Sequence, residues 1–333
     1  MEKQYIAEFN HVSIDYEMVK LCLHAVNDVS MKLEKGKITA VVGESGSGKT
    51  TLASALLNCI TSPGRVVGGS VIVHSEKRGE DIDVTSLNEK QLNAFRWDIV
   101  SMVFQGAQSS LNPIVTILNQ FYETYKLHGG KESKKEARKI FAKLLERVNL
   151  SDRVLDSYPH EISGGMKQRV MIAFALLLKP EIIILDEPTT ALDVITQSYI
   201  FGLLKSINEE YGTTMLLLTH DIAVVAEYAD NLGVMYGGRL MEFGTVEDVF
   251  ARRYNPYTEG LINATPSLKR DADTLTEIPG TPVDITNLPQ GCVFAERCPK
   301  KTERCEIVSP DEVDMGDGHM VKCHLYAEEK KNA

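Results

Sequence analysis

The segment GESGSGKT, residues 43–50, constrains the fold of this 333-residue chain more than any other stretch. It fits the pattern G-x-x-x-x-G-K-[ST] and follows the apolar, β-branched run Ile38–Val42, which predicts a buried strand. Glycines in such a loop let backbone N–H groups curl around phosphates, and the start of the next helix adds its positive dipole end. The sequence therefore predicts a strand–loop–helix unit that binds a nucleoside triphosphate.

Two side chains of this loop are expected to have specific roles. Lys49 would supply a cation to the β- and γ-phosphates, and Thr50 a hydroxyl to Mg²⁺. The alternative is a chance glycine-rich turn, which at average composition gives such a match in roughly one chain in a hundred. The residues of this loop predicted to contact ATP or Mg²⁺ are Gly43, Ser45, Gly46, Gly48, Lys49, Thr50 and Thr51.

A second apolar run, IIILDEP at residues 182–188, ends in two carboxylates. A parallel strand presents its ligand-facing groups at its carboxyl end, so Asp186 is expected to hold the hydrated Mg²⁺. Side chains alternate along a strand, which leaves the next residue, Glu187, free to polarise the attacking water as a general base. Such acid pairs also occur as plain surface turns, but downstream of a phosphate-binding loop the catalytic interpretation is favoured.

Two further β-like runs end in the polar residues Gln105 and His220. An isolated His after a strand is more often a polar cap than a catalytic group, and an isolated Gln says less still. Their position gives them weight, because the strand ends of an open α/β fold gather at its ligand-binding edge. We therefore expect Gln105, Glu187 and His220 to be the catalytic residues of one site.

The stretch ISGGMKQR, residues 162–169, predicts a second anion-binding element. Ser163 fits a helix N-cap, and Gly164 and Gly165 expose backbone N–H groups beside a positive helix end. An ordinary capped helix start is the alternative, but it does not account for LDEPTTALD following at this spacing.

Strands and helices alternate from Ser163 onward, which predicts right-handed crossovers and a parallel sheet. Residues 4–42 alternate short β-like runs with turns, whereas Leu87–Arg96 and Lys131–Val148 have helical patterns. Five of the twelve prolines lie in residues 256–289, which predicts a stiff, irregular connector.

The bulk composition excludes some classes of protein. The net charge of −10 argues against a surface made for nucleic acid, where a basic face is expected. The stretch MEKQYIAEFN lacks the apolar segment of a signal peptide, and the longest apolar run, Val170–Leu178, is far shorter than the ~20 residues of a membrane span. We expect a cytosolic protein, whose thiols remain reduced.

Four of the six cysteines crowd into the last part of the chain with the spacing C-x5-C-x6-C-x17-C. A reducing cytosol makes structural disulfides the weakest interpretation. The spacing matches neither the common zinc sites nor the ferredoxin runs, so zinc, an iron–sulfur cluster and free thiols all remain open. Cys22 and Cys59 are expected to be buried small apolar residues. The clustered cysteines are Cys292, Cys298, Cys305 and Cys323.

Together these segments resemble the ATPase subunits of ABC transporters over roughly residues 1–250. The chain carries, in family order, a Walker A loop, a Q-loop glutamine, a signature close to LSGGQ, a Walker B strand, a D-loop ALD and an H-loop histidine. The signature departs from LSGGQ at Ile162 and Met166, and its Ser-Gly-Gly core is intact. The resemblance implies an α/β P-loop NTPase fold with a RecA-like parallel core, an antiparallel β subdomain and a helical subdomain at about residues 87–178.

In that family two nucleotide-binding domains pair head to tail, and the signature of one grips the γ-phosphate of ATP held by the other. By this resemblance His220 would contact the γ-phosphate and Gln105 would couple ATP and Mg²⁺ to the membrane partner. Tyr16 falls where the family stacks an aromatic ring on adenine. The residues implied to face ATP across the dimer are Ser163, Gly164, Gly165 and, within the D-loop Ala191–Asp193, Asp193.

The tail segments NPYTEGLINATP, IPGTPVDI, LPQGCVFAERCP and CHLY resemble the C-terminal extension of dipeptide/oligopeptide import ATPases. In that group four cysteines hold a 4Fe–4S cluster, which the resemblance implies here, with Zn²⁺ as the alternative. Such a centre would chiefly staple a tail without a core of its own. His324 is expected to be an exposed neighbour rather than a substitute ligand. The implied domains are a nucleotide-binding domain at 1–250, a Pro-rich connector at 251–290 and a small Cys-rich extension at 291–333.

The resemblance implies an ATPase that powers import of di- or oligopeptides from the cytoplasmic face of the membrane. Its implied partners are a second ABC ATPase, in a heterodimer rather than a homodimer, two transmembrane permease subunits docked on the helical insertion at 87–160 and, indirectly, an extracytoplasmic substrate-binding protein. No nucleic-acid partner is expected. The alternatives are nickel or oligosaccharide import, an ABC ATPase of DNA repair or translation, and a catalytically silent subunit, which the presence of Glu187 and His220 disfavours.

Overall fold

The computed structural model describes residues 4–106, 109–190, 192–265 and 277–327, so parts of the predicted connector and extension lie outside the described residues. The described chain forms two compact units. The first is drawn from Met1–His74, Asp81–Ser86 and Leu218–Ala333, and the second from Ser75–Glu80 and Leu87–Leu217.

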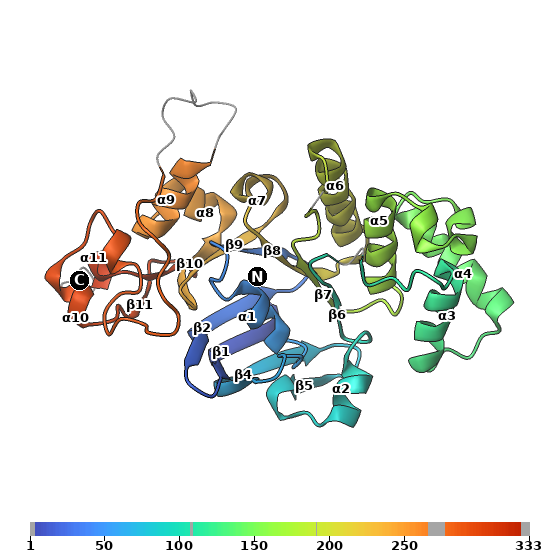
Figure 1. The fold of residues 1–333 in the computed structure, drawn as a ribbon, viewed down its shortest axis with the longest axis horizontal. Helices are drawn as coiled ribbons and strands as arrows, with labels where there is room; N and C mark the ends of the chain where they lie inside the picture. The colour runs from blue at the N-terminus through green and yellow to red at the C-terminus, as the bar shows by residue number, and fades with distance from the viewer. Residues whose placement is uncertain (1–3, 107–108, 191, 266–276, 328–333) are drawn as a thin grey trace. The chain divides into compact units, whose positions relative to one another are not determined.

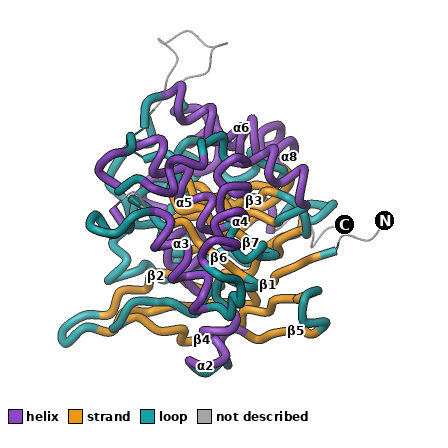
Figure 2. Tube along the Cα trace, turned by 90° about the vertical axis from the view of Figure 1, so that its right-hand side faces the viewer, coloured by secondary structure: helices purple, strands orange, loops and turns teal. Residues whose placement is uncertain are grey.

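The first unit contains an antiparallel layer in the strand order β2-β1-β4-β5, in which β1 pairs antiparallel with both β2 and β4. β1 and β2 are each 13 residues long, longer than the short runs expected from the sequence. Figure 2 shows β1 and β4 as long extended strands. The strands are β1 (Tyr5–Glu17), β2 (Cys22–Glu34), β4 (Gly64–Ser75) and β5 (Glu80–Asp83).

A second set of strands in the first unit surrounds the predicted strand Ile38–Val42, which is confirmed as β3 and is buried throughout. β3 runs parallel to β9, β10 is antiparallel to β9, and β12 and β11 add to β10 in turn. A run buried on both faces is typical of a strand covered by helices. The added strands are β9 (Asn231–Tyr236), β10 (Arg239–Thr245), β11 (Glu312–Asp314) and β12 (Met320–Lys322).

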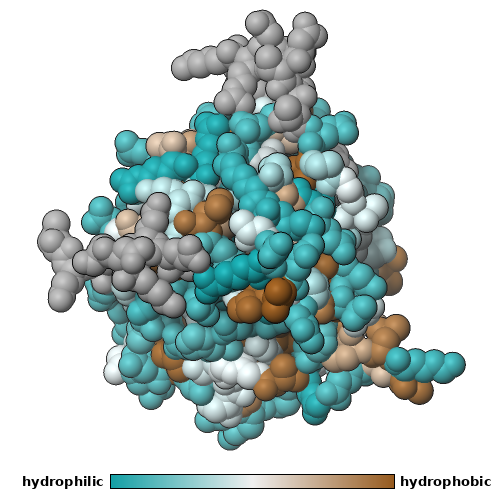
Figure 3. All heavy atoms as spheres, turned by 90° about the vertical axis from the view of Figure 1, so that its left-hand side faces the viewer, coloured by the Kyte–Doolittle hydropathy of each residue, from teal (hydrophilic) through white to brown (hydrophobic). Residues whose placement is uncertain are grey.

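The cysteine-rich tail is therefore part of a sheet, and the expectation of a tail without a core is wrong. Phe294 is buried, and its ring centroid lies 5.3 Å from that of Tyr236 and 5.2 Å from that of Tyr257. Val293 and Val321 are buried as well. In Figure 3, the face that carries the tail is mostly hydrophilic, with hydrophobic residues in small separate patches.

The helices of the first unit include one that the proline content concealed. Residues 256–264 form α9, and Pro256 lies in the first turn, where its missing N–H has no helical partner to lose. The expectation of an irregular connector is wrong for these residues. Figure 1 shows α8 and α9 beside β10. The helices are α1 (Lys49–Ala55), α7 (Ile222–Tyr228), α8 (Val246–Arg252), α9 (Pro256–Ala264), α10 (Glu303–Ile307) and α11 (His324–Ala327).

The second unit combines helices with two parallel strands, and the predicted strand before Asp186 is confirmed as β7. Phe121 lies at the centre of an aromatic core, with ring centroids 5.4 Å from Phe141 and 3.9 Å from Phe174. The chain passes to the first unit within β8 (Thr214–Thr219). The other elements are α2 (Glu89–Phe95), β6 (Val100–Val103), α3 (Ile117–Leu127), α4 (Lys134–Arg147), α5 (Gly164–Ala175), β7 (Ile182–Asp186) and α6 (Val194–Tyr211).

Among the helices of the described residues, none combines the length and the apolar content that a membrane crossing requires.

Candidate active site

The phosphate-binding loop joins β3 to α1 in the first unit, as the sequence predicts. Gly43 has φ +153° and Gly48 has φ +98°, both in the range that favours glycine. A Cβ at Gly43 would lie 2.1 Å from the carbonyl oxygen of Met235, so no side chain fits there. The loop is therefore shaped by backbone geometry that only glycine adopts readily, and Ser45, Gly46 and Thr50 are exposed on it.

Lys49 is folded back across this loop. Its side chain is buried, with the residue 7 % exposed, and Nζ donates to the carbonyl oxygens of Gly43 at 2.7 Å and Glu44 at 3.0 Å. The amine thus lies within the ring of loop atoms that would surround a phosphate, held by carbonyl groups. Tyr16, at the end of β1 in the same unit, covers Gly64: a Cβ there would lie 2.5 Å from the Tyr16 ring.

The tail supports the loop from behind through an arginine that the sequence did not single out. Both terminal nitrogens of Arg297 donate to the Glu44 carboxylate, at 2.8 and 3.0 Å, and its Nε donates to the carbonyl oxygen of Pro279 at 2.8 Å. The Tyr257 hydroxyl accepts from the Glu44 backbone N–H at 3.0 Å. Hydrogen bonding to Glu44 raises the pKa of Arg297 above its ordinary value. Arg297 stands between Cys292 and Cys298, and the sequence motifs gave it no role.

Two of the predicted catalytic residues meet in the second unit. Glu187 follows the buried Asp186 at the end of β7 and has φ +45°, a left-handed conformation that is uncommon for a residue with a side chain. Its Oε2 accepts from Gln105 Nε2 at 2.9 Å and from Thr190 Oγ1 at 3.0 Å. Thr190 was missed from the sequence, where it is one of two threonines after the LDEP segment. A carboxylate that two donors hold, on a residue with an unusual backbone conformation, is typical of a positioned general base.

The third predicted catalytic residue, His220, belongs to the first unit, where it follows β8 and is exposed. The next residue, Asp221, starts α7: its carboxylate accepts from the backbone N–H of Ala223 at 2.9 Å. His220 therefore lies between the end of β8 and the capped start of α7. The structure brings Gln105 and Glu187 together and places His220 in the other unit.

The signature segment lies beside an open cavity of about 640 Å³ in the second unit. Ser163 is confirmed as an N-cap, because its Oγ accepts from the Met166 backbone N–H at 3.3 Å. The contact uses only the backbone of Met166, so this departure from LSGGQ leaves the cap unaffected. The cavity is lined by Ser163, Gly164, Gly165, Arg169, Leu192, Asp193, Ile195, Thr196 and Tyr199.

The predicted D-loop residue Asp193 lines the same cavity and caps α6, while Ala191 lies outside the described residues. Hydrogen bonds from the Thr196 hydroxyl at 2.7 Å and backbone N–H at 2.9 Å hold the carboxylate and lower the pKa of Asp193. Ile195 is 84 % exposed at the cavity rim. Arg169 adds a cation that the sequence analysis missed, with Nη1 donating to the Asn149 carbonyl oxygen at 2.9 Å.

The four clustered cysteines line one cavity of about 450 Å³ in the first unit, together with His324. Burial raises the pKa of Cys292 and of Cys323 to about 11. His324 is buried, with 8 % exposed, so the expectation of an exposed neighbour is wrong. Its Nε2 hydrogen-bonds the Val308 carbonyl oxygen at 2.7 Å.

The two remaining cysteines differ from the expectation of buried apolar residues. Cys22 and Cys59 are only half-buried. Cys22 is the first residue of β2 and pairs with Glu17 at the end of the β1–β2 ladder.

A phosphate-binding loop, an acid pair at the end of a buried strand and a capped Ser-Gly-Gly helix define a P-loop ATPase of the ABC cassette class. A family model described as ABC transporter matches residues 26–190, and one described as oligopeptide/dipeptide transporter, C-terminal region, matches residues 241–305. The chain belongs to the oligopeptide/dipeptide transport family of ABC ATP-binding proteins.

Two curated relatives are similar over most of their length. The oligopeptide transport ATP-binding protein AppD of Bacillus subtilis is 40 % identical over 97 % of this chain and 98 % of its own. The oligopeptide transport ATP-binding protein OppD of Escherichia coli is 41 % identical over 92 % of this chain and 88 % of its own. A bacterial ABC transporter cassette solved as a dimer has a TM-score of 0.63 at 30 % identity, covering 72 % of this chain and 99 % of that one. The ABC cassette fold is confirmed.

Proposed function

We propose that this protein is the ATP-hydrolysing subunit of an ABC importer for dipeptides and oligopeptides. The single observation that carries the catalytic part is the geometry of Glu187. Its backbone is left-handed, and its carboxylate accepts hydrogen bonds from Gln105 and Thr190 next to the buried Asp186. Relatives of about 40 % identity that are named for oligopeptide transport support the substrate class.

In this proposal the chain positions ATP and water for an in-line attack. Lys49 exchanges its carbonyl partners for the β- and γ-phosphates, and Thr50 and Asp186 hold Mg²⁺ directly or through water. Glu187 accepts the proton of the attacking water, with Gln105 orienting the carboxylate, and His220 contacts the γ-phosphate. A positioned general base contributes a factor of about 10² to 10⁴ in rate.

The signature half of the site acts across a dimer. Ser163, Gly164 and Gly165 present hydroxyl and backbone N–H groups to ATP held by the partner's loop, and Asp193 signals between the two sites. The open cavity around these groups and the exposed Ile195 beside it support a surface that a second ATPase covers. We propose a heterodimer with a similar ATPase, bound at the cytoplasmic face of the membrane through two permease subunits that dock on residues 87–160.

Tyr16 stacks on adenine. The division into a nucleotide-binding domain at 1–250, a connector at 251–290 and an extension at 291–333 separates the ATPase from its cysteine-rich support.

The four-cysteine cavity is proposed to hold a 4Fe–4S cluster. In the described residues, no three of these sulfur atoms all lie within 4.8 Å of one another, whereas thiolates around one zinc would be ~3.8 Å apart for Zn–S bonds of about 2.3 Å. The wider spread fits a larger group, which would be held by Cys292, Cys298, Cys305 and Cys323. Binding would release the protons of these thiols, because the ligands are thiolates. A bound cluster supplies a covalent cross-link with redox capacity.

Elemental analysis of protein purified without air tests the cluster. Iron with acid-labile sulfide and broad visible absorbance is the expected result. Colourless protein with one zinc ion per chain would support the alternative metal and end the cluster proposal.

The variant Glu187→Gln tests the catalytic proposal. We expect ATP turnover to fall by at least about 100-fold while ATP binding persists and the dimer accumulates, because the base is lost and the site is otherwise intact. Turnover is measured as phosphate release with the permease present, and dimerisation by size-exclusion chromatography. Glu209→Gln, on an exposed position of α6, is the matched control with unchanged turnover. Wild-type turnover in Glu187→Gln would refute the assignment of the base.

A further inference from the structure

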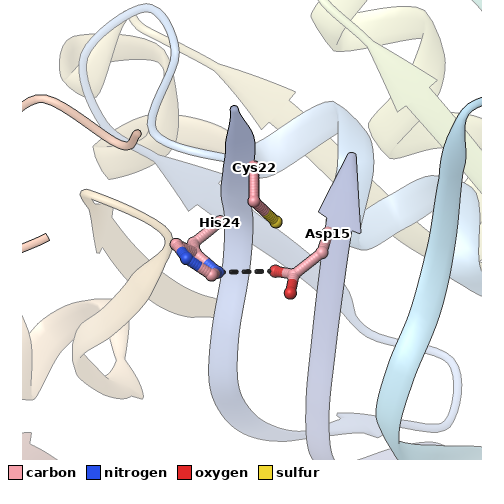
Figure 4. Close-up of side chains that lie close together, drawn as sticks. All are labelled: Asp15, Cys22 and His24. Atoms are coloured by element: carbon pink, nitrogen blue, oxygen red, sulfur yellow. Dashed lines mark hydrogen bonds and ion pairs between the residues drawn. The ribbon is translucent and has the colours of Figure 1, made fainter. Parts of the chain in front are cut away.

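Asp15, Cys22 and His24 gather three different ligand atoms at the open end of the β1–β2 ladder (Figure 4). One carboxylate oxygen, the thiol sulfur and one ring nitrogen all lie within 4.8 Å of one another. Across the described parts of the chain, no other set of three or more His, Cys, Asp or Glu side chains converges this closely. The cluster shares no residue with the phosphate-binding loop or with the four-cysteine cavity.

A bulge in the ladder creates this convergence. Ile14 is opposite Val26, but Asp15 is opposite His24, so β2 contains one extra residue, Ala25. In an unbroken register Asp15 would face Ala25, and His24 would point to the other side of the sheet. Bulges re-aim side chains in this way. Cys22 is two residues from His24 and therefore points to the same side.

We propose that Asp15, Cys22 and His24 bind a late first-row divalent cation such as Zn²⁺. Carboxylate oxygen, thiolate and imidazole nitrogen are all zinc ligands, and water completes four-coordination at a site with three protein ligands. The thiolate and carboxylate together match the charge of a divalent ion.

An ion would displace the hydrogen bond between His24 and Asp15, and little nearby charge would repel it. His24 Nδ1 and Asp15 Oδ1 are 2.9 Å apart, so a small separation of the two strand ends admits an ion between them. All three residues are half-buried, which allows entry from solvent. The nearby cation, Arg65, is paired with Glu17.

Titration of the full chain with Co²⁺ under anaerobic conditions tests the site, because cobalt bound to a thiolate gives a near-ultraviolet charge-transfer band. We expect a component of this band, equivalent to one ion per chain, that Zn²⁺ displaces and Cys22→Ser abolishes. Asp15→Asn and His24→Gln should weaken cobalt binding at this site by at least about 10-fold. Cys59→Ser should retain the component. His11→Gln, which removes an exposed His–Asp pair without a thiol, should leave its affinity unchanged.

A second measurement needs no substitution. Zn²⁺ should slow the alkylation of Cys22 in the wild-type chain by at least about 10-fold, as read by mass spectrometry of the peptide, because a metal-bound thiolate is shielded. An alkylation rate that Zn²⁺ does not change, or the absence of any Cys22-dependent cobalt band at millimolar Co²⁺, would overturn the proposal. The three residues would then be an imidazole–carboxylate pair beside a free thiol.

Discussion

Arg297 and Glu44 show, at the scale of single residues, how far the support of the phosphate-binding loop extends. The guanidinium is bidentate to the carboxylate, and the side chains are 6 % and 24 % exposed. Bidentate charge-assisted pairs of this kind fix geometry as well as adding energy. Sequence reasoning found Lys49 because its motif is local. It missed Arg297, because its partner is 253 positions away and its neighbours in the sequence form no recognised motif.

Replacing Arg297 by Gln is expected to destabilise the protein by about 2 kcal/mol, because Glu44, which is only partly exposed, loses its counter-ion. ATP affinity should fall as the loop loosens. Thermal unfolding and nucleotide titration measure the two effects.

Lys300→Gln is the matched control, since its ion pair with Glu259 is solvent-exposed and is worth less than about 1 kcal/mol. Adding Glu44→Gln to Arg297→Gln should restore part of the lost stability. Strict additivity of the two single changes would show that the pair does not interact.

At the scale of elements, α9 and the tail strands depend on one buried amide. Asn255 caps α9 by accepting from the Tyr257 backbone N–H at 2.9 Å, and its Nδ2 donates to the carbonyl oxygen of Lys322 at 2.9 Å. The same residue thus joins a helix to β12. The helix was concealed from sequence reasoning because five prolines between residues 256 and 289 outweighed a capping residue directly before Pro256.

The variant Asn255→Ala should cost about 2 kcal/mol or more, since a cap is worth about 1 kcal/mol and a buried carbonyl oxygen left unpaired costs about 1–3 kcal/mol. Chemical denaturation measures the loss. Asn88→Ala, which removes an exposed cap from α2, should cost about 1 kcal/mol. An equal loss in the two variants would contradict the bridging role of Asn255.

At the scale of the whole molecule, the sequence motifs correctly predicted the strands and the helix start that depend on local backbone chemistry. The structure confirms the strand before Gly43, the strand that ends at Asp186 and the helix capped by Ser163. The sequence predicted only that Gln105 and Glu187 would lie at the same edge of the sheet. It did not predict their hydrogen bond, because motif spacing does not show contacts between side chains 82 positions apart. The packing of the tail was missed because its apolar residues are few and scattered.

A chain that ends after residue 276 is expected to aggregate, because Tyr236, Tyr257 and the free edge of β10 lose the cover that Phe294 and β12 provide. A full-length variant with all four tail cysteines changed to serine should remain folded, with a lower melting temperature, since it keeps this packing. Solubility and near-ultraviolet circular dichroism distinguish the two. A well-folded truncated chain would show that the tail is dispensable.

The ion pair between Glu44 and Arg297 has a consequence for the folding of the chain during synthesis, because its two residues are made far apart in time. The ribosome adds Glu44, in the phosphate-binding loop, 253 codons before it adds Arg297. Until the codon for Arg297 has been translated, the Glu44 carboxylate of the nascent chain lacks this partner. Every stop codon between the phosphate-binding loop and Arg297 therefore leaves that loop without the guanidinium that binds Glu44.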